Sequence, residues 1–221
     1  MIEIRQIQKN YKKKTVLRDI SLTVQQGSCV GILGGNGSGK STLLSILAGV
    51  QKADNGSFLW EGADLFCNEK LRMQLLGYVP QGNPLMEELT AWDNLRLWYE
   101  KKDLQRQLES GVLAMLGIPE FIRVPVRKMS GGMRKRLSIG CAVANNPRIL
   151  LLDEPSAALD FICKERIGNY LKDFKAQGGT ILLATHDVQE LDLCDAWYIL
   201  KDGVLVPYVY DGNVHHLVGK L

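Results

Sequence analysis

The sequence contains no apolar run near the roughly 20 residues that a membrane-spanning helix needs. Its start, Met1 to Arg5, lacks the basic and then apolar order that marks a secretory signal. No low-complexity linker, internal repeat or long charged tail divides the 221 residues, of which 46% are hydrophobic. We therefore expect a single domain over residues 1–221, with a core of its own and a cytoplasmic location.

Paired cysteines and a strong charge of one sign are also missing. No Cys-x-x-Cys pair occurs, and each cysteine lies in or near an apolar stretch, so we expect packed, reduced thiols. The five cysteines are Cys29, Cys67, Cys141, Cys163 and Cys194. A net charge of +3, without a basic stripe of interleaved aromatics, predicts no nucleic-acid partner. His215 and His216 are adjacent, so their side chains diverge, and we expect them on the surface rather than on a metal.

A glycine-rich run with a lysine and two hydroxyls stands out, since residues 34–42 read Gly-Gly-Asn-Gly-Ser-Gly-Lys-Ser-Thr. The apolar residues before it, Cys29 to Leu33, suit a buried strand, and Leu43 to Ala48 after it have helical composition. Strand, glycine loop and helix in this order form the context of a P-loop, which binds the phosphates of a nucleotide. A loop that only turns the chain would not need the lysine and hydroxyl in this register.

Each residue type in this run suits a phosphate ligand. Glycines adopt positive φ and let backbone N–H groups converge on an anion, while the helix start adds about half a positive charge. Lys40 can reach the β- and γ-phosphates, Ser41 can ligate Mg²⁺, and Thr42 can donate a hydrogen bond to the α-phosphate. A magnesium-bound nucleoside triphosphate is therefore the expected ligand. The candidate binding residues are Gly34, Asn36, Gly37, Ser38, Gly39, Lys40, Ser41 and Thr42.

Apolar patterning predicts an α/β fold. The continuous runs at 149–152 and 181–184 are typical of parallel strands that are covered on both faces. Met1 to Ile7 and Ile20 to Val24 alternate more loosely, which favours an antiparallel sheet near the N-terminus. Leu89 to Val143 is mostly helical in composition, so we expect a helical insertion in the α/β core.

Two adjacent carboxylates, Asp153 and Glu154, follow the apolar run at 149–152. Ligands of parallel sheets bind at the carboxyl edge, where these side chains would lie. Asp153 would hold the Mg²⁺ shell, and Glu154 would orient and polarise an attacking water. The alternative, in which both residues only cap the next helix, loses support because a P-loop is present.

A second glycine turn, Ser130-Gly131-Gly132, precedes a basic run that favours helix. Its backbone N–H groups and the Ser130 hydroxyl suit a second anion. One nucleotide already occupies the Lys40 loop, so this turn would hold a phosphate bound by another subunit. Taken alone the signal is weak, because Ser-Gly-Gly is also a common linker or helix start. The basic residues 134–136 also fit a solvated helix face.

Together these motifs resemble those of the ATP-binding cassette (ABC) ATPase family, in the family's order from Tyr11 to His186. The resemblance implies a P-loop NTPase core of the RecA type with a mostly parallel sheet. It also implies an N-terminal antiparallel β-subdomain and a helical subdomain inserted at about 82–145. By resemblance Tyr11 stacks on adenine, Gln81 contacts Mg²⁺ or water, and His186 contacts the γ-phosphate. Taken alone, Tyr11 also fits a half-buried strand end, and His186 a packed or capping residue.

The resemblance further implies that two cassettes, identical or related, form a head-to-tail dimer with ATP between them. Each ATP would lie between the Lys40 loop of one subunit and the Ser130 turn of the other, with Ser156 to Asp160 crossing the interface. Water polarised by Glu154 would hydrolyse ATP, the dimer would open, and a separate transmembrane permease would move. Permease contact is expected near Gln81 and at Asn83 to Asn94, on the inner face of the membrane.

Two residues depart from the family pattern: Met133 replaces the usual glutamine, and Ala158 the usual glycine. A Ser-Gly-Gly-Met turn followed by basic residues is similar to that of exporter cassettes, so we favour export. A non-transport cassette that drives a mechanical or assembly process at the cell envelope would carry the same motifs. A nucleic-acid machine is disfavoured for lack of a coiled-coil insertion, and a P-loop kinase does not need the Ser130 turn.

Overall fold

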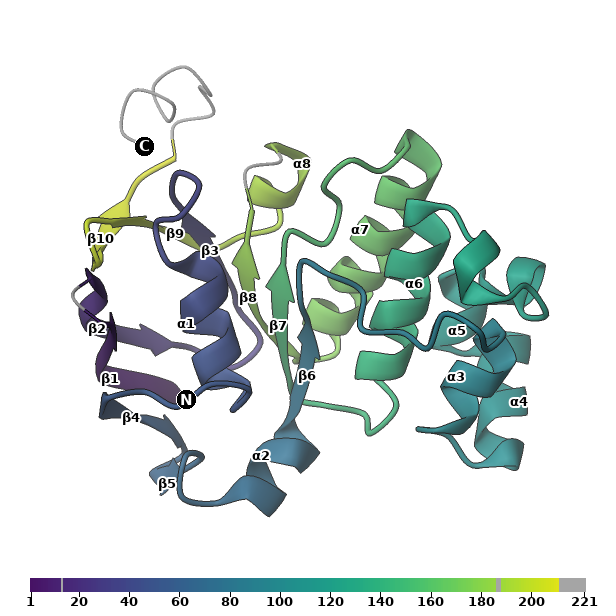
Figure 1. Cartoon of the computed structure of the whole chain (residues 1–221), viewed down its shortest axis with the longest axis horizontal. Coiled ribbons are helices and arrows are strands. Elements are labelled where there is room, and N and C mark those ends of the chain that lie inside the picture. Colours follow the sequence, from purple (N-terminus) through teal and green to yellow (C-terminus); the bar gives the residue numbers. More distant parts are fainter. Residues whose placement is uncertain (13, 186–187, 211–221) are drawn as a thin grey trace.

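A computed structural model of the chain describes residues 1–12, 14–185 and 188–210. Its central sheet consists of β3 (Cys29–Leu33), β6 (Leu76–Val79), β7 (Ile149–Asp153), β8 (Thr180–Ala184), β9 (Ala196–Lys201) and β10 (Val204–Tyr208). The six strands follow the order β10-β9-β3-β8-β7-β6 (Figure 1). β10 is antiparallel to β9, and the other neighbouring pairs are parallel. The predicted α/β fold with a mostly parallel sheet is confirmed.

The strands of this sheet are apolar throughout because both of its faces are covered. Every residue of β3, β7 and β8 is buried. Successive side chains of a strand point to opposite faces, so Leu150 and Leu152 join one apolar core while Ile149 and Leu151 join another. The parallel sheet therefore separates two cores, and its carboxyl edge is held rigidly between them.

An antiparallel sheet lies near the N-terminus, as the looser alternation predicted. It consists of β1 (Ile2–Tyr11), β2 (Lys14–Val24), β4 (Asn55–Trp60) and β5 (Ala63–Asp64), in the order β2-β1-β4-β5. β1 and β2 extend beyond the predicted ranges, because main-chain pairing continues through polar residues, as between Lys9 and Leu17. The apolar face of this sheet packs on the same core as α1 (Lys40–Leu47).

Most of the helices lie between β6 and β7, where helical composition was predicted. They are α3 (Ala91–Arg96), α4 (Lys101–Ser110), α5 (Val112–Met115), the 3₁₀ helices η1 (Ile118–Phe121) and η2 (Val126–Lys128), and α6 (Gly131–Ala142). Outside this region the chain forms α2 (Glu69–Leu75), α7 (Phe161–Ala176) and α8 (Val188–Leu191). Thr90 and Asp93 form a capping box that starts α3, so the sequence itself specifies this helix start. The division of the chain into subdomains at 82–145 stays a prediction.

The helices that follow the two glycine loops cover opposite faces of the central sheet (Figure 1). Leu43 and Leu44 of α1 pack in the core that includes Ile149 and Leu151 of β7. Leu137 of α6, together with residues of α7, packs in the other core. The N-termini of α1 and α6 are thus separated by the sheet within one chain.

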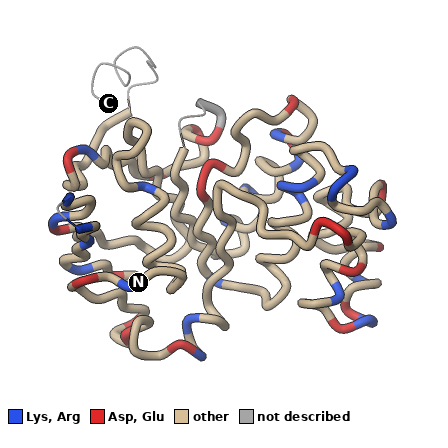
Figure 2. Tube along the Cα trace, in the orientation of Figure 1, with Lys and Arg blue, Asp and Glu red and all other residues tan. Residues whose placement is uncertain are grey.

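Within the described residues, no helix combines the length and the apolar character that a membrane crossing needs. Figure 2 shows acidic and basic residues interspersed over the outer elements, with few on the central strands. Charge of one sign therefore does not set one half of the described chain apart from the other.

One expectation and one alternative interpretation about side chains are wrong in part. Cys67 is exposed, because the apolar residues before it fill the core and its own side chain faces solvent near Asp64. The other four cysteines are buried or half-buried free thiols, as expected. Lys135 and Arg136 are only 4% and 7% exposed, so the basic run of α6 is not a solvated face. The predicted surface histidines His215 and His216 lie outside the described residues.

Candidate functional site

The glycine loop, residues 34–39, connects β3 to α1 by a path that requires glycine. Gly34, Gly37 and Gly39 have φ values of 157°, 76° and 111°. A Cβ added at Gly34 would lie 2.5 Å from the Leu200 carbonyl oxygen and 2.6 Å from Ser38 Oγ. The loop is therefore a tight backbone turn whose N–H groups are not screened by side chains, which is the arrangement that binds phosphate. Asn36 lies exposed at its tip.

Lys40 starts α1 and turns back over this loop. Its Nζ donates hydrogen bonds to the carbonyl oxygens of Gly34 and Gly35, at 2.6 Å and 3.2 Å. Burial lowers the pKa of Lys40, while the negative charges of Glu154 and Asp153 oppose that shift. The ammonium group is thus held, largely desolvated, between the glycine loop and two carboxylates. It can exchange its carbonyl partners for the oxygens of a bound phosphate.

Asp153 ends β7 and lies 1% exposed opposite the start of α1. Desolvation raises the pKa of its carboxyl group, and a hydrogen bond from the Ser41 side chain opposes that shift. Among the described residues, its Oδ1 atom is buried without a hydrogen-bond partner. A hydroxyl and a carboxylate with an unpartnered buried oxygen are hard oxygen donors, so these residues fit a Mg²⁺ ion. Thr42, next on α1, lines a groove together with Ser41 and Asp153.

Glu154 follows Asp153 and lies beside Gln81, which follows β6. Nε2 of Gln81 donates a hydrogen bond to Oε2 of Glu154 at 3.0 Å. The backbone of Glu154 is left-handed, with φ of 49°, and its N–H donates to the Ala184 carbonyl oxygen at 2.9 Å. This unusual backbone turns the carboxylate out of the sheet edge toward Gln81. The structure therefore brings together the predicted base and the predicted glutamine.

Lys135 of α6 is a residue of this site that sequence reasoning missed. Its Nζ donates hydrogen bonds to the carbonyl oxygens of Pro80 and Gln81, at 2.9 Å and 3.0 Å. Burial lowers its pKa, and the charges of Asp153 and Glu154 oppose that shift. Lys135 therefore fixes the position of the main chain at Pro80 and Gln81. The basic run after the Ser130 turn carried no signal that separated this lysine from Arg134, which is half-buried, or Arg136, which is buried elsewhere.

The Ser130 turn begins α6, as predicted from its glycines. Ser130 is the N-cap, and its Oγ accepts a hydrogen bond from the N–H of Met133 at 3.2 Å. A Cβ added at Gly131 would meet no atom of the described residues within 4 Å, whereas Gly132 is buried. Because α1 and α6 cover opposite faces of the sheet, the structure does not bring this turn to the Lys40 loop of the same chain.

The predicted roles of Tyr11 and His186 in nucleotide binding stay predictions. Tyr11 is 43% exposed at the end of β1. Its hydroxyl donates a hydrogen bond to Gln51 after α1, and the Lys9 ammonium lies 5.5 Å from the centre of its ring. These contacts leave much of the ring accessible, and stacking on adenine stays a prediction. His186 lies outside the described residues, directly after the buried residue Thr185.

A groove of about 900 Å³ runs from this site toward the helices between β6 and β7. Its lining includes Ser41, Gln81 and Asp153 at one end and Leu97 and Trp98 at the other. Met86 and Asn94 also line the groove, so it connects the predicted nucleotide site with the segment Asn83 to Asn94, for which permease contact was predicted. Leu97 and Trp98 lie just beyond that segment in the chain.

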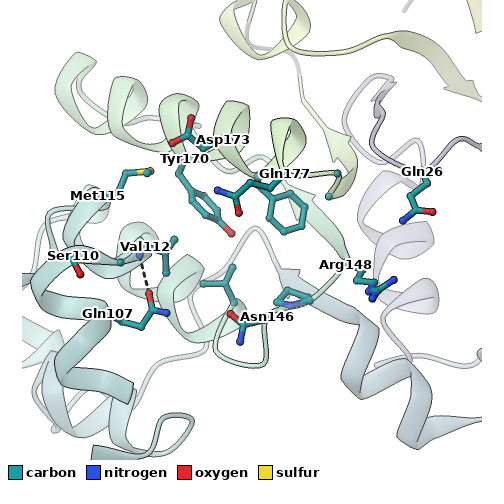
Figure 3. Close-up of a pocket in the computed structure, with 16 residues that line it drawn as sticks. Gln26, Gln107, Ser110, Val112, Met115, Asn146, Arg148, Tyr170, Asp173 and Gln177 are labelled. Carbon is teal, nitrogen blue, oxygen red and sulfur yellow. Dashed lines mark hydrogen bonds between the residues drawn. The ribbon is translucent and has the colours of Figure 1, made fainter. Parts of the chain in front are cut away.

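A second cavity, of about 710 Å³, lies on the α7 side of the sheet, at its amino edge. Figure 3 shows Tyr170, Gln107 and Asn146 around it. Its lining residues include none of the predicted nucleotide-binding residues.

Comparison with known proteins agrees with this geometry. The family model described as ABC transporter matches residues 17–157. This chain belongs to the ABC transporter family. In solved structures, the ATP-binding cassette MJ0796, described as dimeric and bound to ADP and Pi, is 30% identical with a TM-score of 0.83. That match covers 93% of this ABC cassette and 96% of MJ0796. The P-loop NTPase fold and the ATP-binding assignment are thereby established.

Several curated relatives of this ABC cassette have names that refer to export. The Nod factor export ATP-binding protein I of Sinorhizobium fredii is 36% identical over 99% of this cassette. The cassette spans 64% of that protein's length. The lipopolysaccharide export system ATP-binding protein LptB of Acidithiobacillus ferridurans is 33% identical, over 92% of this cassette and 87% of LptB. A spermidine/putrescine import ATP-binding protein of Spiroplasma citri is 35% identical over 93% of this cassette.

Proposed function

We propose that this cassette hydrolyses Mg-ATP to power transport, with export favoured, through a separate transmembrane permease. The observation that carries the proposal is the hydrogen bond between Gln81 and Glu154, beside the Lys40 loop and Asp153. Phosphoryl transfer needs positioning and charge stabilisation more than covalent chemistry. A buried lysine, a carboxylate suited to a metal and a carboxylate suited to water, all at one sheet edge, supply these requirements.

Each residue of the site has a role in this proposal. The N–H groups of the glycine loop bind the phosphates, and Lys40 neutralises the charge that develops on the transferred group. Ser41 and Asp153 would hold Mg²⁺, with Gln81 as a further ligand or water contact, and the ion would supply positive charge to the phosphates. Glu154 accepts a proton from the attacking water, and the Gln81 amide holds the carboxylate of Glu154 in place before reaction. His186 would contact the γ-phosphate.

A second cassette completes the site in this proposal. Ser130, Gly131 and Gly132 form a helix start suited to an anion, but the sheet separates them from the Lys40 loop of the same chain. They can contribute to a nucleotide site only across a subunit interface. We therefore infer a head-to-tail dimer of identical or related cassettes, with Ser156 to Asp160 at the interface. ATP binding closes the dimer, and hydrolysis opens it.

The permease would dock on the groove that leads away from the nucleotide site. Met86, Leu97 and Trp98 line it with 55%, 55% and 57% of their surface exposed, although all three are large and apolar. Exposed apolar side chains that line a concave surface are typical of protein interaction sites. Gln81 lies in the same groove, so movement of a docked permease segment would shift Gln81 and, through its hydrogen bond, Glu154. We further propose that the cassette lies on the inner face of the membrane, bound there through its permease.

Export is favoured over import by the Ser-Gly-Gly-Met turn and by the export names of relatives such as those from Sinorhizobium and Acidithiobacillus. The alternative is a cassette that drives a mechanical or assembly process at the cell envelope. Its hydrolytic site would be identical. The two proposals differ in the partner, and the partner is therefore what the experiment must identify.

The test uses the Glu154→Gln variant, which keeps the shape of the side chain and removes the base. We expect turnover to fall by about 10²–10⁴ while ATP binding is kept, so that an ATP-bound dimer accumulates. The variant is captured from gently solubilised native membranes with ATP and Mg²⁺. Trp98→Ala is tested in the same background, with Val206→Ala on β10 as the exposed apolar control.

A stoichiometric polytopic membrane protein that is retained by the Val206→Ala control and lost with Trp98→Ala would support the permease proposal. Soluble partners alone, with ATPase activity intact in the parent, would favour the mechanical or assembly alternative. Full turnover by Glu154→Gln would contradict the assignment of the base.

A further inference from the structure

The first turns of α6 and α7 approach each other closely at one glycine. A Cβ added at Gly132 would lie closer than 3.0 Å to the Cys163 sulfur, 3.2 Å from Cys163 Cβ and 3.7 Å from Asp160 Oδ2. Real Cβ atoms almost never approach other atoms below 3.0 Å. The start of α6 can therefore rest on α7 only because residue 132 has no side chain.

The sulfur that meets Gly132 is itself fixed. Asp160 is the N-cap of α7, and its Oδ1 accepts a hydrogen bond from the Cys163 N–H at 2.8 Å. The Cys163 thiol also hydrogen-bonds to the Asp160 side chain, and the residue is 5% exposed. One hydrogen bond at the Cys163 N–H, one at its thiol, and burial thus leave the Cys163 sulfur little freedom to move. Asp160, in turn, ends the segment that the proposed dimer places at the interface.

The two glycines of the Ser130 turn differ in their surroundings. Within the part of the chain that the structure describes, a Cβ at Gly131 would meet nothing within 4 Å, whereas a Cβ at Gly132 would collide with α7. Gly131 is therefore open to a ligand or to a partner subunit, and Gly132 is the point at which the turn touches its own chain.

We propose that Cys163 is a positioning residue. Its sulfur sets the distance between the Ser130 turn and the segment Ser156 to Asp160. The proposal rests on the function proposed above, in which this turn binds the phosphate held by the second cassette. The cysteine side chain fills the space between α7 and Gly132. Added side-chain volume at Gly132 or at Cys163 displaces the Ser130 turn and weakens its binding to the nucleotide held by the partner cassette.

Binding of ATP to the Lys40 loop of the same chain should be insensitive to this contact. The loop precedes α1, which lies on the opposite face of the central sheet from α6 and α7. A positioning role therefore predicts a split result, with dimerisation lost and binding by the single cassette kept. A general loss of folding would reduce both.

The experiment is a double-mutant cycle in the Glu154→Gln background. Gly132→Ala adds the colliding methyl group, Cys163→Ala removes the sulfur, and the double variant combines them, leaving two Cβ atoms 3.2 Å apart. Gly168→Ala is the matched control, because an added Cβ at this glycine of α7 would have no described residue within 4 Å. Each variant is measured for ATP-dependent dimerisation by analytical ultracentrifugation, for ATP affinity as a dilute monomer, and for thermal unfolding.

We expect Gly132→Ala to weaken dimerisation by about tenfold or more, since overpacking between fixed elements displaces them. Its monomer ATP affinity should stay within about twofold, and adding Cys163→Ala should restore most of the lost dimerisation because directly contacting residues are coupled. Gly168→Ala should dimerise as the parent does.

The proposal is overturned if Gly132→Ala folds and dimerises normally, or if Cys163→Ala gives no rescue. If the Glu154→Gln parent stays monomeric with ATP, the proposed function fails instead. The thermal unfolding cycle then still reports whether Gly132 and Cys163 are coupled, and additive shifts would overturn the contact as well.

Discussion

Nε2 of Gln81 donates a hydrogen bond to Oε2 of Glu154 at 3.0 Å, although the two residues lie 73 positions apart in the chain. They meet because β6 and β7 are neighbouring parallel strands, in which Val79 pairs with Leu152. The residues that follow both strands therefore leave the sheet at the same edge. Lys135 supports the Gln81 side of this contact through two main-chain carbonyl groups. The orientation of the proposed base is thus set by three separate segments.

Replacing Gln81 by glutamate should move the pH profile of ATP hydrolysis. Two carboxylates at hydrogen-bond distance resist joint ionisation, so the pKa at which the pair loses its last proton rises. The base is active when deprotonated, and the acid limb of kcat should therefore shift to higher pH by about one to two units. Gln81→Leu, which adds no charge, should lower kcat without this shift. Coincident profiles for parent and Gln81→Glu would contradict the pairing.

Asp153→Asn should change stability and activity in opposite directions. Desolvation raises the pKa of Asp153, so in the metal-free protein its contribution to the free energy of unfolding is lost as pH rises through that pKa. At neutral pH the neutral amide should therefore make the metal-free protein more resistant to thermal unfolding. The Mg²⁺ concentration needed for half-maximal turnover should rise by about tenfold or more, because a charged ligand is lost. If Asp153→Asn lowered both the stability of the metal-free protein and its activity, desolvation of the Asp153 carboxylate would not be the dominant effect at this position.

Lys135→Met should slow hydrolysis without loosening the nucleotide. The methionine keeps an unbranched apolar stem, but the donors to the carbonyl oxygens of Pro80 and Gln81 are lost. We expect kcat to fall by about tenfold, because small misplacements of a positioning residue are costly, while ATP affinity changes by about twofold or less. Lys172→Met, at an exposed position of α7, serves as the control. Equal losses of affinity and kcat would indicate a global rather than a positional effect.

Ala158→Gly should stabilise the fold. Ala158 has φ of 58°, a left-handed backbone that costs a residue with a Cβ roughly 1–2 kcal/mol. Glycine avoids that cost but loses more entropy on folding, so the net gain in the free energy of unfolding should be about 1 kcal/mol or less. Ala157→Gly, at a neighbour without positive φ, should destabilise instead. Thermal unfolding of both variants tests this prediction. A lower unfolding temperature for Ala158→Gly than for the parent would contradict backbone strain at Ala158.

Asp54→Ala should reduce stability at neutral pH but not in acid. The Asp54 carboxylate accepts hydrogen bonds from the Asn10 N–H at 2.6 Å and from the Lys9 Nζ at 3.1 Å. The Asn10 hydrogen bond, above all, lowers the pKa of Asp54 below its ordinary value of 3.8. A lowered pKa contributes stability above the unfolded-state pKa, and this is lost as pH falls through the folded-state pKa. Urea unfolding of both proteins should therefore differ at neutral pH and converge well below pH 3.8.

The sequence by itself determined the elements that depend on local pattern. The run Gly34 to Thr42 needs its glycines because the backbone there takes positive φ, and the apolar strands at 149–152 and 181–184 are uninterrupted because both faces of the sheet are covered. The Ser130 turn was predictable as a helix start, since an N-cap and the glycines after it are contiguous in the chain. The family resemblance came from such local signals in their order.

Tertiary structure alone decided which distant residues act together. The basic run of α6 reads the same whether Lys135 is solvated or buried under Gln81, because burial depends on how α6 packs against the end of β6. The separation of the Lys40 loop from the Ser130 turn, and the contact of Gly132 with Cys163, depend on which face of the sheet each helix covers. Residue patterns specify a helix or a strand, but the distances between such elements arise only from their packing.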